Sequence, residues 1–324
     1  MTTYTLDDED RLLTIRKTII VAIASDDVLM ERLVLKGGNA LDIIYKLGER
    51  SSLDVDFSMS RGLEGVDELD EIRSRLFRAL RDRFDSLGYV VFDEKFEERP
   101  RPKPGQEPGV GITLWGGYNA TFKLIAKDVD KKGREEIANR TRKKFKREPT
   151  VEDFLLARRN RAQVTGTGAG SERVFYIEIS KFEYTEGRVL QNVEQFDCYV
   201  YTPAMIAAEK LRAICQQLPE YELRKNPAPR PRDFFDIHTI ATLADCDLVA
   251  PEHHKLVRNM FQTKDVPLDL LLSIGSDDVR AFHAQQWGSV TNSVRGSTES
   301  FDFYFDFVAG IAPRLREALG QEGG

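Results

Sequence analysis

The sequence is poor in the residues that build disulfide frameworks and zinc sites. Its three cysteines, Cys198, Cys215 and Cys246, lie far apart and match no metal-site spacing. We therefore expect reduced, structural thiols in a reducing compartment. The four histidines show no pair at a chelating spacing, since His253 and His254 are adjacent and would point apart on a helix. Zinc enzymes and disulfide-stabilised secreted domains are thus disfavoured.

Long apolar runs and an excess of positive charge are also missing. No window approaches about eighteen consecutive apolar residues, so no membrane span is predicted. The first thirteen residues are acidic and lack an apolar stretch, unlike a signal peptide, so we expect a cytoplasmic protein. The net charge of −6 excludes a polycation, and any nucleic-acid contact must come from a local patch. With 41% hydrophobic and 31% charged residues among 324, the chain can build a globular core.

The hydrophobic pattern predicts an α+β fold in two parts. Alternating segments indicate strands near 32–38, 52–59, 89–98, 111–127, 173–184 and 194–203, and 3.6-residue periodicity indicates helices near 8–32, 39–48 and 66–88. Asn39 is a possible helix cap. Strand patterns fade after Pro203. We predict a mixed α/β domain over residues 1–200, with an inserted basic helical arm at about 130–165, and an α-helical domain over 201–324.

An acidic pair follows a glycine pair in the first part. In a strand, Asp54 and Asp56 point to one face while their neighbours point into the core. Two such carboxylates repel each other unless a divalent cation binds them. Gly37 and Gly38 follow a strand and open a helix, where phosphates could approach backbone N–H groups. A solvated strand face and an ordinary turn are the alternatives for each motif taken alone.

Three charged residues of the second part fall on apolar helix faces. Lys210 lies within the arc that contains Ile206 and Ile214, so it needs an anion such as a triphosphate, unless it extends to solvent at the edge of that arc. On the same projection Glu209 and Arg212 lie on the other side of the helix. In a second helix Asp233 and Asp236 both face inward. Asp233 could instead cap this helix, an explanation that does not extend to Asp236.

These motifs together resemble the AbiEii/AbiGii nucleotidyltransferase toxins, a branch of the DNA polymerase β-like superfamily. The resemblance rests on four motifs in order, within residues 33–58 and 170–244. They are the glycine pair Gly37 and Gly38, the sequence "RSSLDVDF" with Arg50, Ser52, Asp54 and Asp56, the sequence "EKLRA" with Glu209, Lys210 and Ala213, and the sequence "RDFFD" with Arg232, Asp233 and Asp236.

The resemblance implies a minimal nucleotidyltransferase sheet and nucleotidyl transfer that depends on Mg²⁺ or Mn²⁺. Asp54 and Asp56 would bind the metal, and Glu178 of "YIEIS" would be a third carboxylate, or else an exposed strand residue. Ser52 would position the nucleoside triphosphate with the glycines, Lys210 and Arg232. The aspartate motif would organise the site, either by orienting Lys210 or by acting near the acceptor hydroxyl.

The resemblance also implies partners: tRNA or another RNA as acceptor, and a cognate antitoxin, in a toxin–antitoxin or phage-defence system. Nine basic residues of the arm, from Arg140 to Arg161, could hold RNA phosphates or could form a solvated surface. Two other classes remain open. A D-x-D glycosyltransferase would use the acidic pair but not the helical motifs, and a non-catalytic RNA- or protein-binding module would keep only the fold.

Overall fold

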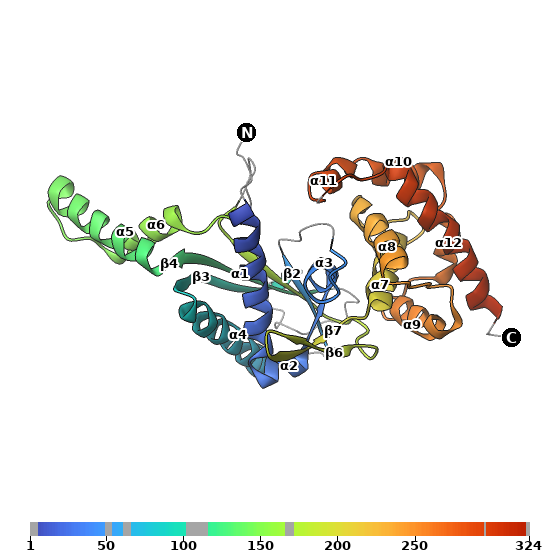
Figure 1. The fold of residues 1–324 in the computed structure, drawn as a ribbon, viewed down its shortest axis with the longest axis horizontal. Helices are drawn as coiled ribbons and strands as arrows, with labels where there is room; N and C mark the ends of the chain where they lie inside the picture. Colours follow the sequence, from blue (N-terminus) through green and yellow to red (C-terminus); the bar gives the residue numbers. More distant parts are fainter. Residues whose placement is uncertain are drawn as a thin grey trace.

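The computed structural model describes residues 6–48, 54–60, 66–101, 116–165, 172–294 and 296–321. Figure 1 shows three parts in a row: a projecting helical arm, a central sheet with helices, and a group of helices that ends at the C-terminus. The predicted α+β class is confirmed as far as a mixed sheet combined with helices.

Seven strands form one mixed sheet in the order β3-β4-β5-β2-β1-β7-β6. They are β1 (Leu33–Lys36), β2 (Val55–Met59), β3 (Tyr89–Arg99), β4 (Gly117–Ala126), β5 (Phe175–Ser180), β6 (Val189–Val193) and β7 (Phe196–Val200). The central strand β2 is antiparallel to β1 and parallel to β5. Two chain segments more than a hundred residues apart, the DVD strand and the IEI strand, thereby become neighbours.

Strand β6 was not predicted from the sequence. It forms a hairpin with β7, and the two turn residues Glu194 and Gln195 both have positive φ, 49° and 80°. Such tight hairpin turns normally carry glycine or asparagine at these positions. Because positions 194 and 195 hold neither glycine nor asparagine, the sequence shows no sign of a turn. The predicted strand over 194–203 therefore includes both turn residues.

Helices α1 (Leu6–Ala24) and α4 (Val66–Ser86) contact each other and pack against the sheet. The single helix predicted over 8–32 is wrong, because α1 ends at Ala24 and α2 (Asp27–Arg32) follows it. The break lies at Asp26, whose side chain accepts hydrogen bonds from the backbone N–H groups of Val28 and Leu29. A new helix therefore begins there with its first donors satisfied.

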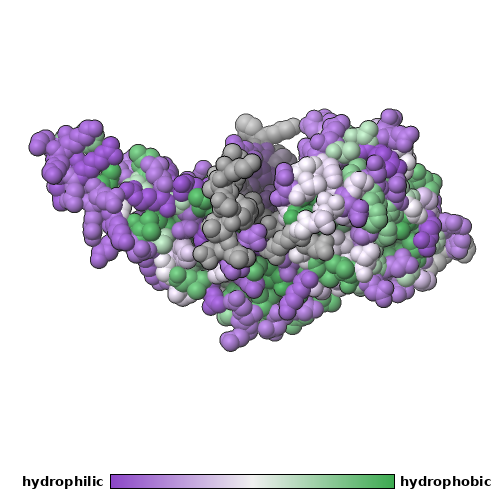
Figure 2. All heavy atoms as spheres, turned by 45° about the horizontal axis from the view of Figure 1, so that its top comes forward, coloured by the Kyte–Doolittle hydropathy of each residue, from purple (hydrophilic) through white to green (hydrophobic). Residues whose placement is uncertain are grey.

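The arm is a helical hairpin inserted between β4 and β5. It comprises α5 (Lys127–Arg140), a π-helical turn η2 (Thr141–Phe145) and α6 (Val151–Arg161), and Figure 2 shows it as largely hydrophilic. Thr150 and Asp153 form a capping box that begins α6. Several predicted RNA-binding residues are ion-paired within the protein: Arg142, Arg147, Arg158, Arg159 and Arg161 bind carboxylates.

The C-terminal part is helical among the described residues. It contains α7 (Pro203–Cys215), α8 (Pro231–Leu243), α9 (Pro251–Gln262), η3 (Leu268–Ser273), α10 (Asp277–Ala284), α11 (Trp287–Thr291) and α12 (Phe301–Gln321). One hydrophobic cluster runs from α1 through the sheet into α7, α8 and α12. In the part of the chain that the structure describes, no helix is long and apolar enough to cross a membrane.

Candidate active site

A row of polar side chains crosses five strands on one face of the sheet. Each residue of the row is paired with the next one on the neighbouring strand. From β1 through β2, β5 and β4 to β3 the row consists of Lys36, Asp56, Glu178, Asn119 and Glu97. Opposed residues of paired strands share a face. The neighbouring residues, such as Val55 and Ile177, point the other way into the core and are 0% exposed. The alternation predicted for both strands thus places Asp56 beside Glu178.

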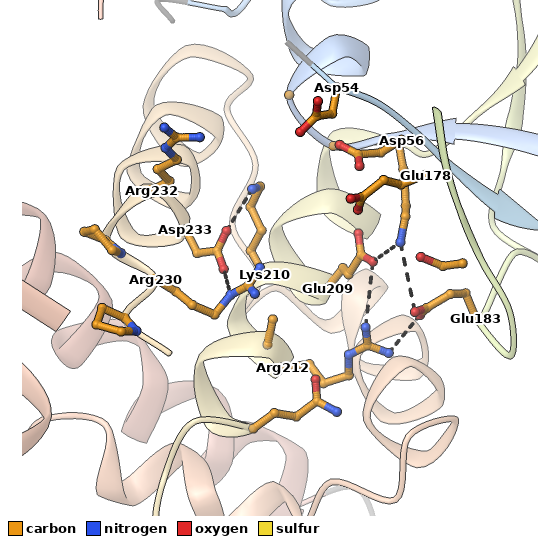
Figure 3. A pocket seen from close by; sticks show the side chains of 18 of the residues that line it. Asp54, Asp56, Glu178, Glu183, Glu209, Lys210, Arg212, Arg230, Arg232 and Asp233 are labelled. Carbon is orange, nitrogen blue, oxygen red and sulfur yellow. Dashed lines mark hydrogen bonds and ion pairs between the residues drawn. The ribbon is translucent and has the colours of Figure 1, made fainter. Parts of the chain in front are cut away.

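These carboxylates line a cavity of about 760 Å³ between the sheet and the helices. Figure 3 shows Asp54, Asp56 and Glu178 on one side, and Lys210, Arg232 and Asp233 on the other. The rest of the described lining is Lys36, Gly37, Gly38, Ser180, Glu183, Glu209, Arg212, Ala213, Gln216, Arg224, Pro229, Arg230, Pro231, Gln286 and Ser289. All predicted site residues except Ser52 and Asp236 therefore meet at one cavity. Ser52 lies outside the described residues, as does Arg50.

The two aspartates carry raised pKa values. Burial is the main cause for Asp56, and Glu178, Asp54 and Glu209 add to it, so that its pKa rises to about 7 although the Lys36 ammonium opposes the rise. Burial and the Glu178 carboxylate likewise raise the pKa of Asp54, while the Arg232 guanidinium lowers it. Burial and the repulsion between these carboxylates both disfavour their charged forms, and a bound cation would offset both effects.

Gly37 has a structural role that the sequence did not reveal. Its φ is +68°, a conformation that L side chains rarely adopt, and a Cβ built there would lie 2.6 Å from Oδ2 of Asp56. The Asp56 carboxylate thus occupies the space beside the backbone of Gly37. A phosphate cradle at Gly37 and Gly38 stays a prediction, and both residues line the cavity.

Replacing Gly37 with alanine is expected to impair both fold and activity. The new methyl group would displace the Asp56 carboxylate and require a strained backbone, at a cost of about 1–3 kcal/mol in the free energy of unfolding. Chemical denaturation would measure the loss, and Gly88→Ala is a control. Gly88 also has a positive φ, +79°, but a Cβ there would meet no atom within 4 Å. If both variants lose the same stability and Gly37→Ala keeps its activity, the contact with Asp56 has no role.

Asn39 positions the acidic strand, and its predicted role as a helix cap is wrong. The helix begins at Gly37 (α3, Gly37–Asn39) and continues as a π-helical turn η1 (Ala40–Ile44), which ends before the predicted stop at Gly48. Asn39 is 0% exposed, and its Nδ2 donates to the backbone oxygen of Asp54 at 2.5 Å. Its Oδ1 accepts from Nη1 of Arg16 at 3.0 Å. Helix α1 thereby holds the start of the acidic strand in place.

On the opposite wall Lys210 faces inward, as predicted. Its Nζ lies 3.0 Å from Oδ1 of Asp233 and 2.6 Å from Oδ2 of Asp236, and both aspartates are 3% exposed. The anions beside Lys210 are thus these two carboxylates. Asp233 also binds Arg230, and although burial raises its pKa, Arg230 and Lys210 lower it below the usual value. Asp233 is not the N-cap residue of α8, because Arg230 takes that position and Asp233 lies in the first turn, where it accepts hydrogen bonds from Lys210 and Arg230.

A buried ionic cluster underlies the acidic row, and the sequence did not predict it. We call it the Glu183 network; its members are Lys36, Glu183, Glu209, Arg212 and Lys264. Glu183 Oε2 lies 2.9 Å from Nη1 of Arg212, and its Oε1 lies 3.2 Å from Nζ of Lys264. Lys36 Nζ is 2.6 Å from Oε1 of Glu209 and 4.0 Å from Oε1 of Glu183. Burial alone would lower the pKa of Lys36, but the two glutamates outweigh it and raise the pKa.

The helical projection therefore placed two residues of α7 wrongly. Arg212 is 3% exposed, and Glu209 reaches across to Lys36 of the sheet. The projection failed because α7 is buried on more than one side, so polarity does not mark a solvent face here. Three cations and two carboxylates form the network, which leaves an excess of positive charge beside Asp56.

The donor set on the acidic wall fits a hard divalent cation. Asp54, Asp56 and Glu178 offer only oxygen ligands, the kind that Mg²⁺ prefers. Within the described residues no group of three or more His, Cys, Asp or Glu side chains is placed so that it could hold a metal ion by itself. Mg²⁺ normally keeps several waters and binds through one or two carboxylates plus substrate phosphates, so a complete protein cage is not required.

The sequence was also compared with known proteins. None of the curated proteins in the comparison matched it. One family model, described as the nucleotidyl transferase AbiEii toxin of a type IV toxin–antitoxin system, matches residues 18–307. The chain belongs to the AbiEii family. This match covers most of the chain and includes every motif on which the resemblance rested, so the predicted AbiEii membership is confirmed. The family description also implies an antitoxin partner.

Proposed function

We propose that the chain transfers a nucleoside monophosphate from a nucleoside triphosphate to an acceptor hydroxyl. The observation that carries the proposal is the cavity itself, where Asp54, Asp56 and Glu178 face Lys210 and Arg232. Such a transfer needs a cation site beside the reacting phosphate and positive charge beside the departing one. The central β1-β2-β5 strands, with paired acids on β2, also support the minimal nucleotidyltransferase fold implied by the family.

In the proposed reaction the acceptor oxygen attacks the α-phosphorus of the triphosphate. A bond forms between that oxygen and the α-phosphorus, the bond to the α,β-bridging oxygen breaks, and pyrophosphate leaves with the bonding electrons. The hydroxyl proton passes to Glu178 or to water. Asp54, Asp56 and Glu178 would hold Mg²⁺ or Mn²⁺, which when bound supplies Lewis-acid polarisation of the phosphoryl oxygens.

Lys210 would bind the triphosphate, and Asp233 and Asp236 would orient it. Their contacts of 3.0 and 2.6 Å with its ammonium group support an orienting role over one near the acceptor hydroxyl. Asp236 is absent from the described cavity lining, which agrees with this assignment. An ammonium held by two buried carboxylates is fixed in position before the substrate arrives, so less entropy is lost on binding.

By family membership we propose that the acceptor is tRNA or another RNA, and that the protein acts as a toxin countered by an antitoxin. Incubation with Mg²⁺, each α-labelled nucleoside triphosphate in turn, and total RNA tests the proposal. We expect label on RNA from an α-labelled but not from a γ-labelled triphosphate. Transfer from a UDP-sugar instead would identify a glycosyltransferase, and the absence of any transfer would favour a non-catalytic binding module.

A further inference from the structure

A second recess opens beside the candidate active site. Its volume is about 310 Å³, and it shares Glu178 and Ser180 with the larger cavity. From there it continues over β4 toward the edge strand β3, where its other described lining residues are Arg99, Pro100, Gly116, Gly117, Tyr118, Asn119 and Ile179. We call it the β4 recess. It leads directly from the third carboxylate to the edge of the sheet.

Asn119 is one of the residues that line the β4 recess. It pairs with Glu178 on one side and with Glu97 on the other, so it continues the polar row of the active site. Its Oδ1 is buried and has no hydrogen-bond partner in the part of the chain that the structure describes. A buried acceptor without a partner is costly, and native proteins rarely keep one without a reason. A hydroxyl group of a ligand would satisfy it.

The order of the strands places the β4 recess where an acceptor is needed. Gly37 and Gly38 follow β1 and lie on one side of the acidic strand β2, whereas Glu178 and Asn119 lie on β5 and β4 on the other side. In phosphoryl transfer the attacking and leaving oxygens are roughly in line. If the pyrophosphate lies toward β1, the attacking hydroxyl must approach from the side of β5 and β4.

Two arginines mark the outer end of the β4 recess: Arg99 lines it, and Arg101 lies two residues further along the chain. Glu97 binds two guanidinium groups, Nη2 of Arg99 at 3.0 Å and Nη2 of Arg101 at 3.3 Å. Both arginine side chains are mostly exposed, 54% and 71%. Each guanidinium has five N–H donors, so the contact with Glu97 leaves donors available for phosphate oxygens. From the sheet edge inward the recess thus offers first guanidinium groups and then the Asn119 oxygen. A polyanion that ends in a sugar with free hydroxyl groups matches this order.

We propose that the β4 recess binds the terminal nucleoside of an RNA acceptor. Asn119 Oδ1 accepts a hydrogen bond from a hydroxyl of the terminal ribose, and Arg99 and Arg101 contact phosphates of the preceding nucleotides. Asn119 is thus a substrate-positioning residue that directs the acceptor toward Glu178. The inference rests on the proposed nucleotidyl transfer, to which it adds the place and the chemistry of acceptor binding.

Photo-cross-linking and transfer kinetics together test the inference. A short single-stranded oligoribonucleotide that ends in 4-thiouridine is the binding probe, and total RNA with an α-labelled nucleoside triphosphate is the activity assay. The variant is Asn119→Ala, which removes a side-chain oxygen that no described group uses. The control is Thr121→Ala, because Thr121 lies on the same face of β4 two residues further on and is absent from the described lining of both cavities.

We expect the probe to cross-link to β3, β4 or β5. Asn119→Ala should weaken this cross-linking and raise the KM for RNA about fivefold, the effect expected when one hydrogen bond is lost. The KM for the nucleoside triphosphate should stay within twofold of the native value. Cross-links elsewhere, or equal behaviour of Asn119→Ala and Thr121→Ala, would overturn the inference. Label on the protein itself would overturn RNA as the occupant. Correct cross-links without transfer of label would refute the proposed reaction but retain the RNA site.

Discussion

Replacing Asp56 with asparagine is expected to lower the rate of nucleotidyl transfer by about a thousandfold or more, while the protein stays folded. Asparagine keeps the shape of the side chain but loses the charge that would hold a divalent cation, whose contribution to the transition state is several kcal/mol. Single-turnover transfer from an α-labelled nucleoside triphosphate to RNA measures the effect. Asp82→Asn is the matched control, since Asp82 is exposed on α4 and lines neither cavity.

The stability of this variant separates the cation-site interpretation from a purely structural role. Burial raises the pKa of Asp56 to about 7, against about 4 in an unfolded chain. Between these values the folded state holds a proton that the unfolded state has lost, so the folded state loses stability as the pH rises through this window. Without divalent cations, Asp56→Asn should therefore become more stable than the native protein from pH 4 to pH 8. If it is less stable at pH 8, the carboxylate stabilises the fold and is not held for a cation.

The largest expected effect on stability comes from Glu183→Ala. The Glu183 carboxylate contacts Arg212 and Lys264 and lies within 4.0 Å of Lys36. Its removal leaves Glu209 as the remaining carboxylate of the network beside three buried cations. Breaking a buried pair in this way costs about 3–5 kcal/mol. Thermal and chemical denaturation at pH 7 measure the loss. Glu186→Ala is the control, because Glu186 is exposed on the same connection between β5 and β6.

The pH dependence of the Glu183 contribution has the opposite sign from that of Asp56. Burial would raise the Glu183 pKa, but Arg212, Lys36 and Lys264 lower it to about 2. Its stabilising effect is therefore present above the unfolded pKa, near 4.5, and is lost as the pH falls toward 2. The difference between the native protein and Glu183→Ala should shrink across this acidic range. A constant difference would mean that lost packing, not lost charge, destabilises the variant.

Local periodicity predicted the parts of the site that lie on regular elements. The period of two in "LDVDF" and "YIEIS" was enough to place Asp56 and Glu178 on the faces of their strands that point away from the hydrophobic core. The period of 3.6 was enough to turn Lys210, Asp233 and Asp236 inward. These predictions needed no knowledge of the partners, because each depends only on residues a few positions apart.

What the sequence did not predict depends on contacts between distant segments. Lys36 ends an apolar strand just before the glycine pair, a position that could have signalled a buried charge, but its partner Glu209 is 173 residues away. Asn39 follows the glycines as a cap would, yet its amide bridges Arg16 and the backbone of Asp54. Alternation along β4 places Asn119 opposite the buried residues Tyr118 and Ala120, but only the strand register places it beside Glu178. The predicted boundary near residue 200 stays a prediction.

The Glu183 network has a consequence for the chain as a folding unit. Lys36 and Glu183 belong to the part before residue 200, whereas Arg212 and Lys264 belong to the part after it. If the chain were divided there, each fragment would keep buried charges whose partners lie in the other fragment. We therefore expect that neither fragment folds by itself and that the intact protein melts in one transition. Because the network joins the two parts in the native state, we expect the walls of the cavity to keep their positions when a ligand binds.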